Sequence, residues 1–312
     1  MTPRSSPPVP DPPAHPPDGP LHLPLSWHRT PLAHPRRTTF PLPRSRRTWI
    51  ATADVPPTMP FSDALARIDV PSPVIRGCSP GIAARLKAEG AAVVAVGSEA
   101  ILDLSHVPTE RRSLRELVRR GRRWGVVRPI GGTEGERDRF AELYRHSRHG
   151  GEPQLRGLFR TALTAETPAY VFESREGRWL GGLTLTRVAP GYLHTEIIAR
   201  RPDAPVGTME ALIAGVHAAR RAAGDRWLSL GEVPFILPRE TTGGWSRVLR
   251  WSGPLQEWVY HARGLYRFKG KFRPHWRPLY LCAMPAGIGP AMWWDLMVVS
   301  GYRDLVRYRM RG

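Results

Sequence analysis

Apolar residues recur with two different periods along this chain, and the change of period separates two kinds of predicted structure. From Phe61 to residue 163 the spacing is mostly helical, which predicts helices at residues 62–68, 79–89, 113–125, 134–147 and 153–163. Apolar runs near Val74, at 91–96 and at 100–104 predict strands between these helices. Ser113 and Glu116 have the spacing of a capping box, which places a helix start there.

After Pro168 the apolar period becomes two, as in strands that bury one face. Strands are predicted at 169–174, 179–187 and 192–199, with turns at Glu176-Gly177 and Pro190-Gly191. A helix ending at Gly224 follows, and its apolar residues are Met209, Leu212, Ile213 and Val216. The remaining pattern predicts a strand at 227–231, a helix at 245–251, a strand at 255–260, a short basic helix and a last strand at 279–283.

Three antiparallel strands, a helix, a strand, a helix and two strands form the element order of the GCN5-related acyltransferase (GNAT) fold. The predicted class is therefore α/β, with a mixed, mostly antiparallel sheet flanked by helices. Residues 1–58 carry about half of the 34 prolines and several arginine pairs. That composition predicts a disordered Pro/Arg-rich tail.

The formal net charge of +19 predicts a polyanionic partner, either nucleic acid or an anionic membrane surface. Cys78 and Cys282 are too few for a disulfide framework, and no Cys/His cluster predicts a metal site. The apolar run at 283–300 is interrupted by Pro285, Pro290 and Asp295, so it is a poor candidate for a spanning helix.

Three separated stretches carry a family resemblance: RRPDAPVGTMEALI at 200–213, LSLGEVPF at 228–235 and GLYRFKGKFRPHWRPLYL at 264–281. Together they resemble the C-terminal catalytic domain of bacterial phosphatidylglycerol lysyltransferases, from about residue 74 to 284. The resemblance implies two tandem GNAT-like folds without the membrane-embedded flippase. A truncated first lobe is expected at 59–128, a catalytic lobe at 129–285 and a basic amphipathic helix at 286–312.

The resemblance also implies an activity, namely transfer of an amino acid from aminoacyl-tRNA onto phosphatidylglycerol or a similar anionic lipid. The expected place of action is the cytoplasmic face of the membrane, with no cofactor beyond the aminoacyl-tRNA donor. Two stretches depart from the family pattern. Residues 144–149 do not match the Ser-Asp-x-Trp-like segment that the family carries at this place. Ala199 stands where the family carries an arginine, and the nearest arginine, Arg200, is the next residue.

Three residues are the candidates for catalysis. Of the 46 Lys and Arg residues only three are lysines, and two of them, Lys269 and Lys271, lie in the third stretch. Lysine supplies a compact point charge that arginine does not, so these positions fit a donor that stabilises a tetrahedral intermediate. Glu196 ends an apolar strand and is placed to accept or position the proton of an attacking hydroxyl.

Phosphate groups of tRNA or lipid are expected to bind near these three residues. The loop that ends at Gly207 and Thr208 precedes a helix N-terminus, where free amides favour anions. The other candidates are basic: Arg200, Arg201, Arg263, Arg267 and Arg273. A solvated face or an ordinary helix cap is the alternative interpretation of each.

Two further functions remain open from the sequence. One is an acetyl-CoA-dependent GNAT N-acetyltransferase, although the loop at 201–208 fits the tight glycine-rich pattern of that family poorly. The other is a non-catalytic RNA- or membrane-binding protein on a decayed fold. The arginine-rich stretch at 111–123 and the aromatic, arginine-rich stretch at 290–312 are the candidate surfaces for either partner.

Overall fold

The computed structural model describes residues 18–106, 111–147, 150–160, 163–164, 167–237 and 262–311. Its N-terminal strands and helices are β1 (Trp27–Arg29), β2 (Arg36–Leu42), β3 (Arg47–Val55), α1 (Phe61–Ile68), β4 (Pro73–Cys78), α2 (Pro80–Ala88), β5 (Ala92–Asp103), α3 (Arg112–Arg122), β6 (Gly125–Ile130) and α4 (Glu134–Arg145). Then come β7 (Ala169–Ser174), β8 (Trp179–Ala189), β9 (Tyr192–Arg200), α5 (Thr208–Ala222), β10 (Trp227–Pro234), α8 (Ala262–Gly270), β11 (His275–Ala283), α9 (Pro290–Val299) and α10 (Tyr302–Arg311).

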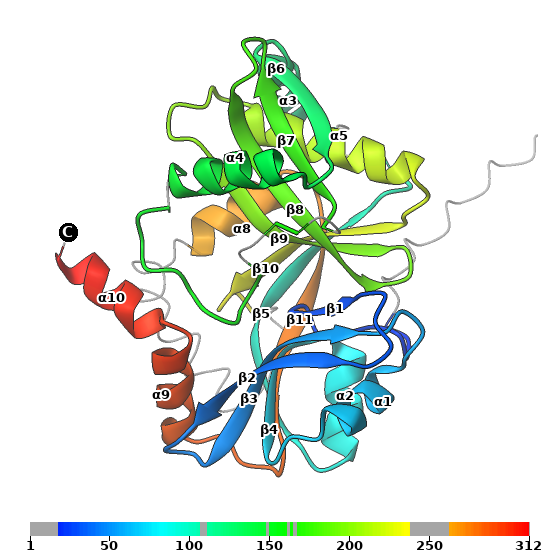
Figure 1. Ribbon diagram of the computed structural model, residues 1–312, viewed down its shortest axis with the longest axis vertical. Helices are drawn as coiled ribbons and strands as arrows, with labels where there is room; N and C mark the ends of the chain where they lie inside the picture. The colour runs from blue at the N-terminus through cyan, green and yellow to red at the C-terminus, as the bar shows by residue number, and fades with distance from the viewer. Residues whose placement is uncertain are drawn as a thin grey trace, which may run out of the picture.

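One continuous sheet runs through the whole molecule (Figure 1). Its strand order is β1-β3-β4-β11-β5-β10-β9-β8-β7-β6, and β2 pairs with β3 off this path. Most pairs are antiparallel, while β1/β3, β3/β4 and β9/β10 are parallel. The sheet and its flanking helices confirm the predicted α/β class with a mixed, mostly antiparallel sheet.

Strand β5 joins the two halves of the sheet. It pairs antiparallel with β11 on one side and with β10 on the other. Strand β11 in turn pairs with β4, so a strand from near the C-terminus is built into the N-terminal half. Residues about 180 positions apart in sequence therefore lie opposite one another at the middle of the sheet, as Glu99 and Arg277 do.

The N-terminal segment corrects the tail prediction for residues 18–58. These residues form β1, β2 and β3, and the side chains of Leu23, Trp27, Trp49 and Ile50 are buried. Proline and arginine content suggested disorder, but the few large apolar residues of the segment suffice to hold three strands against the core. The division into lobes at 59–128 and 129–285 stays a prediction.

Two helix predictions need correction. Residues 153–160 are not helical; Pro153 and Gly157 interrupt the apolar spacing, and Gly157 has a positive φ of 70° where it packs against Trp49. Helix α3 begins at Arg112, with Arg111 as its N-cap and no side-chain cap, so Ser113 and Glu116 form no capping box. A capping box is found instead at Thr133 and Glu136, at the start of α4.

The C-terminal part forms two helices rather than the single predicted one. Gly301, with a φ of 78°, separates α9 from α10. Among the described residues no helix is long and apolar enough to cross a bilayer. The predicted helix at 245–251 and strand at 255–260 lie outside the residues that the structure describes.

Candidate functional site

The candidate site lies where β9 and β10 diverge. These parallel strands pair over three residues only, from Trp227↔Tyr192 to Ser229↔His194. Beyond this point Gly231 adopts a φ of 84° and the pairing of β10 with β5 shifts register. The pairing of β9 with β8 also shifts, between Thr195 and Ile198. Bulges of this kind re-aim side chains, and here they open the sheet around polar residues.

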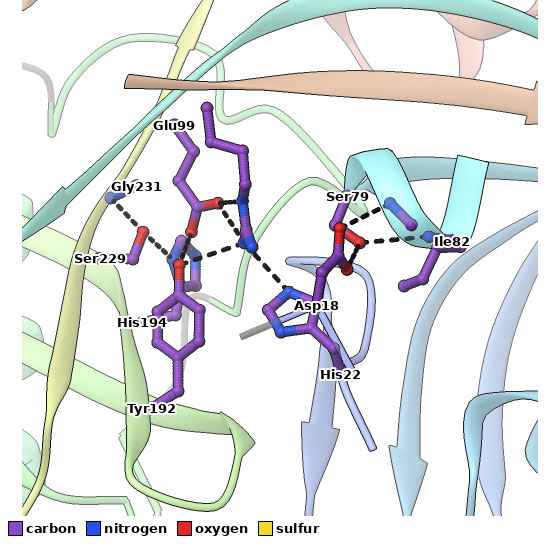
Figure 2. Close-up of polar contacts among 11 residues, drawn as sticks. Asp18, His22, Ser79, Ile82, Glu99, Tyr192, His194, Ser229 and Gly231 are labelled. Carbon is purple, nitrogen blue, oxygen red and sulfur yellow. Dashed lines mark hydrogen bonds and ion pairs between the residues drawn. The ribbon is translucent and has the colours of Figure 1, made fainter. Parts of the chain in front are cut away.

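At the centre of the sheet, Glu99 of β5 is held by two partners. Arg277 of β11, which lies opposite in the register, donates from Nη2 and Nε to Glu99 Oε2 at 2.7 and 3.0 Å. Tyr192 donates from its hydroxyl to Glu99 Oε1 at 2.7 Å (Figure 2). Burial alone would raise the pKa of Glu99, but Arg277 and these hydrogen bonds hold it at about 2. The carboxylate is therefore a fixed, compensated charge.

The N-terminal segment reaches this cluster through His22. Its ring lies 5.2 Å from the ring of Tyr192, and its Nε2 is 3.0 Å from Arg277 Nη2. Burial, followed by the Arg277 charge, lowers the pKa of His22 to about 4. Asp18 anchors the segment, because it accepts hydrogen bonds from the Ser79 hydroxyl and the Gly81 amide at the start of α2 (Figure 2).

Lys269 of α8 lies beside His194 of β9. A Cβ placed on Gly231 would be in ordinary contact with both, at 3.4 Å from His194 Cε1 and 3.6 Å from Lys269 Nζ, so the two side chains meet at this glycine. Lys269 is 3% exposed, and its ammonium donates to the carbonyl of Glu232 at 2.9 Å. The Glu232 carboxylate instead binds Arg76 at 2.6 Å.

Lysine 269 is consequently a buried cation whose hydrogen bond goes to a neutral carbonyl. Burial lowers the pKa of Lys269 to about 7, although Glu232 and Glu99 partly oppose the shift. The same environment lowers the pKa of His194 to about 4, first through burial. At neutral pH Lys269 therefore exchanges between its charged and neutral forms, while His194 stays neutral.

Glu196 lies two residues farther along β9, against the N-terminal strand β1. Its Oε2 accepts the Arg160 amide at 2.8 Å and its Oε1 accepts the Thr186 hydroxyl at 3.0 Å. His28 Nε2 is 3.2 Å from Oε1, without the alignment of a hydrogen bond. Burial outweighs these contacts and raises the pKa of Glu196 to about 7, while burial and Arg160 lower the pKa of His28.

Other predicted residues lie away from this interior. Lys271 is at the surface, with a side chain 42% exposed and an ion pair to Glu210 of α5 at 2.7 Å. Arg263 and Arg267 are exposed on α8, and Arg273 is exposed just before β11. Only Lys269 of the two predicted lysines is brought next to the strands that diverge.

The predicted phosphate loop is covered by α3. Gly207 has a φ of 95°, and a Cβ on it would lie 2.2 Å from the carbonyl oxygen of Leu117. Thr208 is buried and donates its hydroxyl to Pro205. The Arg201 amide donates to the Leu180 carbonyl, and the Arg201 side chain lies 3.8 Å from the Asp203 carboxylate. Arg200, the last residue of β9, is half-buried. Phosphate binding by this loop stays a prediction.

Sequence reasoning missed most of the buried polar cluster: His22, His28, Glu99, Tyr192, His194 and Arg277. A signal was present for one of them, because Glu99 stands inside a strand that is mostly apolar. The two N-terminal histidines were hidden in the segment taken for a tail. In the described part of the chain no three metal-binding side chains come together.

Comparison with known families matches residues 65–283 to the family described as "Phosphatidylglycerol lysyltransferase, C-terminal". Two curated relatives are lysylphosphatidylglycerol biosynthesis bifunctional proteins LysX, from Mycobacterium sp. strains JLS and KMS. Each is 24% identical and covers 74% of this chain, but the matched part is 23% of the relative. The chain thus spans about a quarter of the length of these relatives.

Two solved structures share the fold. The structure of L-PGS from Bacillus licheniformis has a TM-score of 0.61 at 18% identity and covers 76% of this chain and 74% of that one. The C-terminal DUF2156 domain of a putative lysylphosphatidylglycerol synthetase from Agrobacterium fabrum has a TM-score of 0.59 at 21% identity, covering 74% and 72%. The resemblance predicted from three motifs is confirmed, and the matched range includes both Glu196 and Lys269. The chain belongs to the family of phosphatidylglycerol lysyltransferase C-terminal domains, a family of transferases.

Proposed function

We propose that this protein transfers an aminoacyl group from aminoacyl-tRNA to a hydroxyl of phosphatidylglycerol or a similar anionic lipid, at the cytoplasmic face of the membrane. The observation that carries the proposal is the pair of buried groups along the diverging strands. Lys269 and Glu196 both have pKa values near 7 and both lie within the family match. Perturbed ionisable groups of this kind cluster at sites of proton transfer.

The proposed step is an ester exchange. The acceptor hydroxyl oxygen of the lipid forms a bond to the aminoacyl carbonyl carbon, and the ester bond to the terminal ribose oxygen of the tRNA breaks. The hydroxyl proton leaves to a base on the protein and is returned to the ribose oxygen. One ester replaces another, so the reaction balances without an oxidant or a further co-substrate.

Glu196 is the proposed base in this step. A carboxylate with a pKa near 7 is partly ionised at neutral pH and is a much stronger base than an exposed one. The Arg160 amide and the Thr186 hydroxyl hold it in place. His28 lies against the same carboxylate, so the N-terminal strand contributes to its position.

Lys269 is the proposed donor to the oxyanion of the tetrahedral intermediate. Its ammonium is desolvated, and a charge in a site with little water stabilises an oxyanion more strongly than a solvated one. A lysine ammonium can turn toward a developing charge because its three donors rotate. The Glu232 carbonyl holds it in the resting enzyme.

The polyanionic substrates are proposed to bind through surface arginines around this interior. Arg263, Arg267 and Arg273 are exposed near Lys271, and the chain as a whole carries a charge of +19. The alternative of an acetyl-CoA-dependent enzyme is less well supported. That chemistry uses an open helix N-terminus for the cofactor pyrophosphate, whereas Gly207 is pressed against the α3 backbone.

A direct test incubates the whole chain with tRNA charged with labelled amino acids and with phosphatidylglycerol vesicles. Label in the lipid extract that ribonuclease pretreatment abolishes is the expected result. Lys269→Met should remove the signal, and the matched control Lys87→Met, at an exposed lysine, should retain it. Label transfer from acetyl-CoA with none from aminoacyl-tRNA would overturn the proposal.

A further inference from the structure

Helix α9 presents an apolar face to solvent. Its inner side is fixed to the protein by the buried residues Met292, Asp295 and Leu296. On the outer side Trp294 is 39% exposed, and Met297 and Val298 are 38% exposed each. These three positions follow helical spacing, so the exposed residues form one stripe rather than scattered contacts.

Arginines surround this stripe. Arg44, in the turn between β2 and β3, and Arg303 of α10 lie 5.2 and 5.7 Å from the ring of Trp294. The turn is tied to α9, because Ser45 donates its amide to the Asp295 carboxylate at 2.9 Å. Arg303 and Arg307 are exposed one turn apart on α10.

We propose that the outer face of α9 and α10 is the surface that docks on an anionic lipid bilayer. This docking face comprises Arg44, Trp294, Met297, Val298, Arg303 and Arg307. The indole and aliphatic side chains enter the interface region, and the guanidinium groups meet lipid phosphates. The inference rests on the proposed lipid acceptor, and it identifies the surface that holds the protein against its lipid.

The arginine-rich helix α3 provides an internal contrast. Its apolar residues Leu114 and Val118 are buried, and its exposed side is dominated by arginines. Trp124, 53% exposed just after the helix, follows the exposed Arg122 and Arg123, and its exposed apolar neighbour Val126 lies on β6 rather than on α3. In Figure 1 α3 lies at the top, far along the sheet from α9 and α10 at the lower left. Around α3 the exposed apolar residues Trp124 and Val126 lie outside the helix, whereas on α9 three exposed apolar residues share one helix face beside arginines.

The experiment is vesicle flotation of the whole chain with two lipid mixtures. Vesicles of phosphatidylcholine with about a third phosphatidylglycerol should carry the protein upward, and pure phosphatidylcholine should do so much less. Trp294→Glu and the double variant Arg303→Glu/Arg307→Glu should each weaken binding about tenfold or more. Trp124→Glu, the matched control at a tryptophan that is more exposed than Trp294, should leave binding within about twofold.

Further measurements distinguish a failure of the docking face from a failure of the proposed function. Transfer to short-chain phosphatidylglycerol in detergent micelles should stay unchanged in Trp294→Glu, because no bilayer docking is needed there. Vesicle binding without any aminoacyl transfer would overturn the proposed function and leave the docking face standing. Equal vesicle binding by wild type and Trp294→Glu overturns the docking face. A wild-type dimer that dissociates in the Trp294→Glu variant would also overturn the docking face, because the stripe would then be an interface between two copies of the chain.

Discussion

Two groups of buried charges lie in or against the same sheet, and they differ in whether an aligned side chain of opposite charge binds them. Glu99 is fully buried but faces Arg277, and its pKa is lowered to about 2. Lys269 and Glu196 are buried nearly as deeply, yet their hydrogen bonds go to neutral groups. In both, burial disfavours the charged form, which raises the pKa of Glu196 and lowers the pKa of Lys269, each to about 7.

The difference shows that burial alone does not fix the protonation state. An aligned counter-charge locks Glu99 in its ionised form, so it cannot exchange protons near neutral pH. Without such a partner, desolvation brings a lysine and a carboxyl group into the range where each exchanges a proton at physiological pH. The paired group suits a structural role, and the unpaired groups suit catalysis.

The two groups also have opposite effects on folding stability. The lowered pKa of Glu99 contributes stability that is present above about pH 4.5 and is lost as the pH falls toward 2. The lowered pKa of Lys269 costs stability increasingly as the pH falls from 10.5 to about 7. The raised pKa of Glu196 costs stability increasingly as the pH rises from 4.5 to about 7. At neutral pH, Glu99 stabilises the fold while the other two groups strain it.

The largest expected effect comes from breaking the compensated pair. Arg277→Met leaves the Glu99 carboxylate buried without its counter-charge, which costs about 3–5 kcal/mol in the free energy of unfolding. Urea denaturation at pH 7 measures it. Arg119→Met, which removes an exposed ion pair with Glu116, is the control and should leave the unfolding midpoint unchanged. Near-normal stability of Arg277→Met would show that the central pair is dispensable.

The second prediction tests the unpaired lysine. Lys269→Met should lower kcat/KM for aminoacyl transfer by about 10²–10³, because a donor to the oxyanion is lost. Its free energy of unfolding should fall by no more than about 1 kcal/mol, since a desolvated ammonium is removed along with one hydrogen bond. Steady-state kinetics and urea denaturation on one preparation check both values. A large loss of stability would make Lys269 a structural residue like Arg277.

A third prediction separates the two ionisable groups by pH. The wild-type kcat/KM should follow a bell-shaped profile near pH 7, because Glu196 must be deprotonated and Lys269 protonated. Lys269→Arg keeps its charge at high pH, so the alkaline limb should disappear and the maximum should fall about tenfold. Glu196→Gln should abolish the acid limb of the pH profile and lower the maximal kcat/KM about 10²-fold. If both variants keep the acid and alkaline limbs of the wild-type pH profile, neither Glu196 nor Lys269 takes part in the transfer step.

Sequence patterns predicted the elements between residues 169 and 234 well. The strands β7, β8, β9 and β10 and helix α5 appear within a few residues of their predicted positions, because each has regular apolar spacing between clear turns. The N-terminal strands were missed since proline and arginine content outweighed a few decisive apolar residues such as Trp27. The pairing of β11 with β5 is a non-local contact, and no local spacing encodes it.

The candidate site could likewise be predicted only in part from local sequence patterns. Glu196 and Lys269 were predicted from their stretches, but nothing in the sequence separates Lys269 from Lys271. The structure separates them, because Lys269 belongs to α8 and its ammonium is buried near His194, whereas Lys271 lies in the turn after α8 with its side chain 42% exposed. Arg277 and Glu99 could not be linked in advance, because their contact depends on the strand register across the whole chain.

The smallest expected effect concerns that second lysine. The side chain of Lys271 is 42% exposed, so water screens its ion pair with the buried Glu210, which should contribute about 1 kcal/mol or less. Lys271→Arg preserves the charge and should change kcat/KM less than about twofold, with unchanged pH limbs. The same substitution two residues away, at Lys269, is the matched comparison in the same assay. A tenfold loss in Lys271→Arg would place Lys271 at the reaction centre and remove burial as the feature that distinguishes the two lysines.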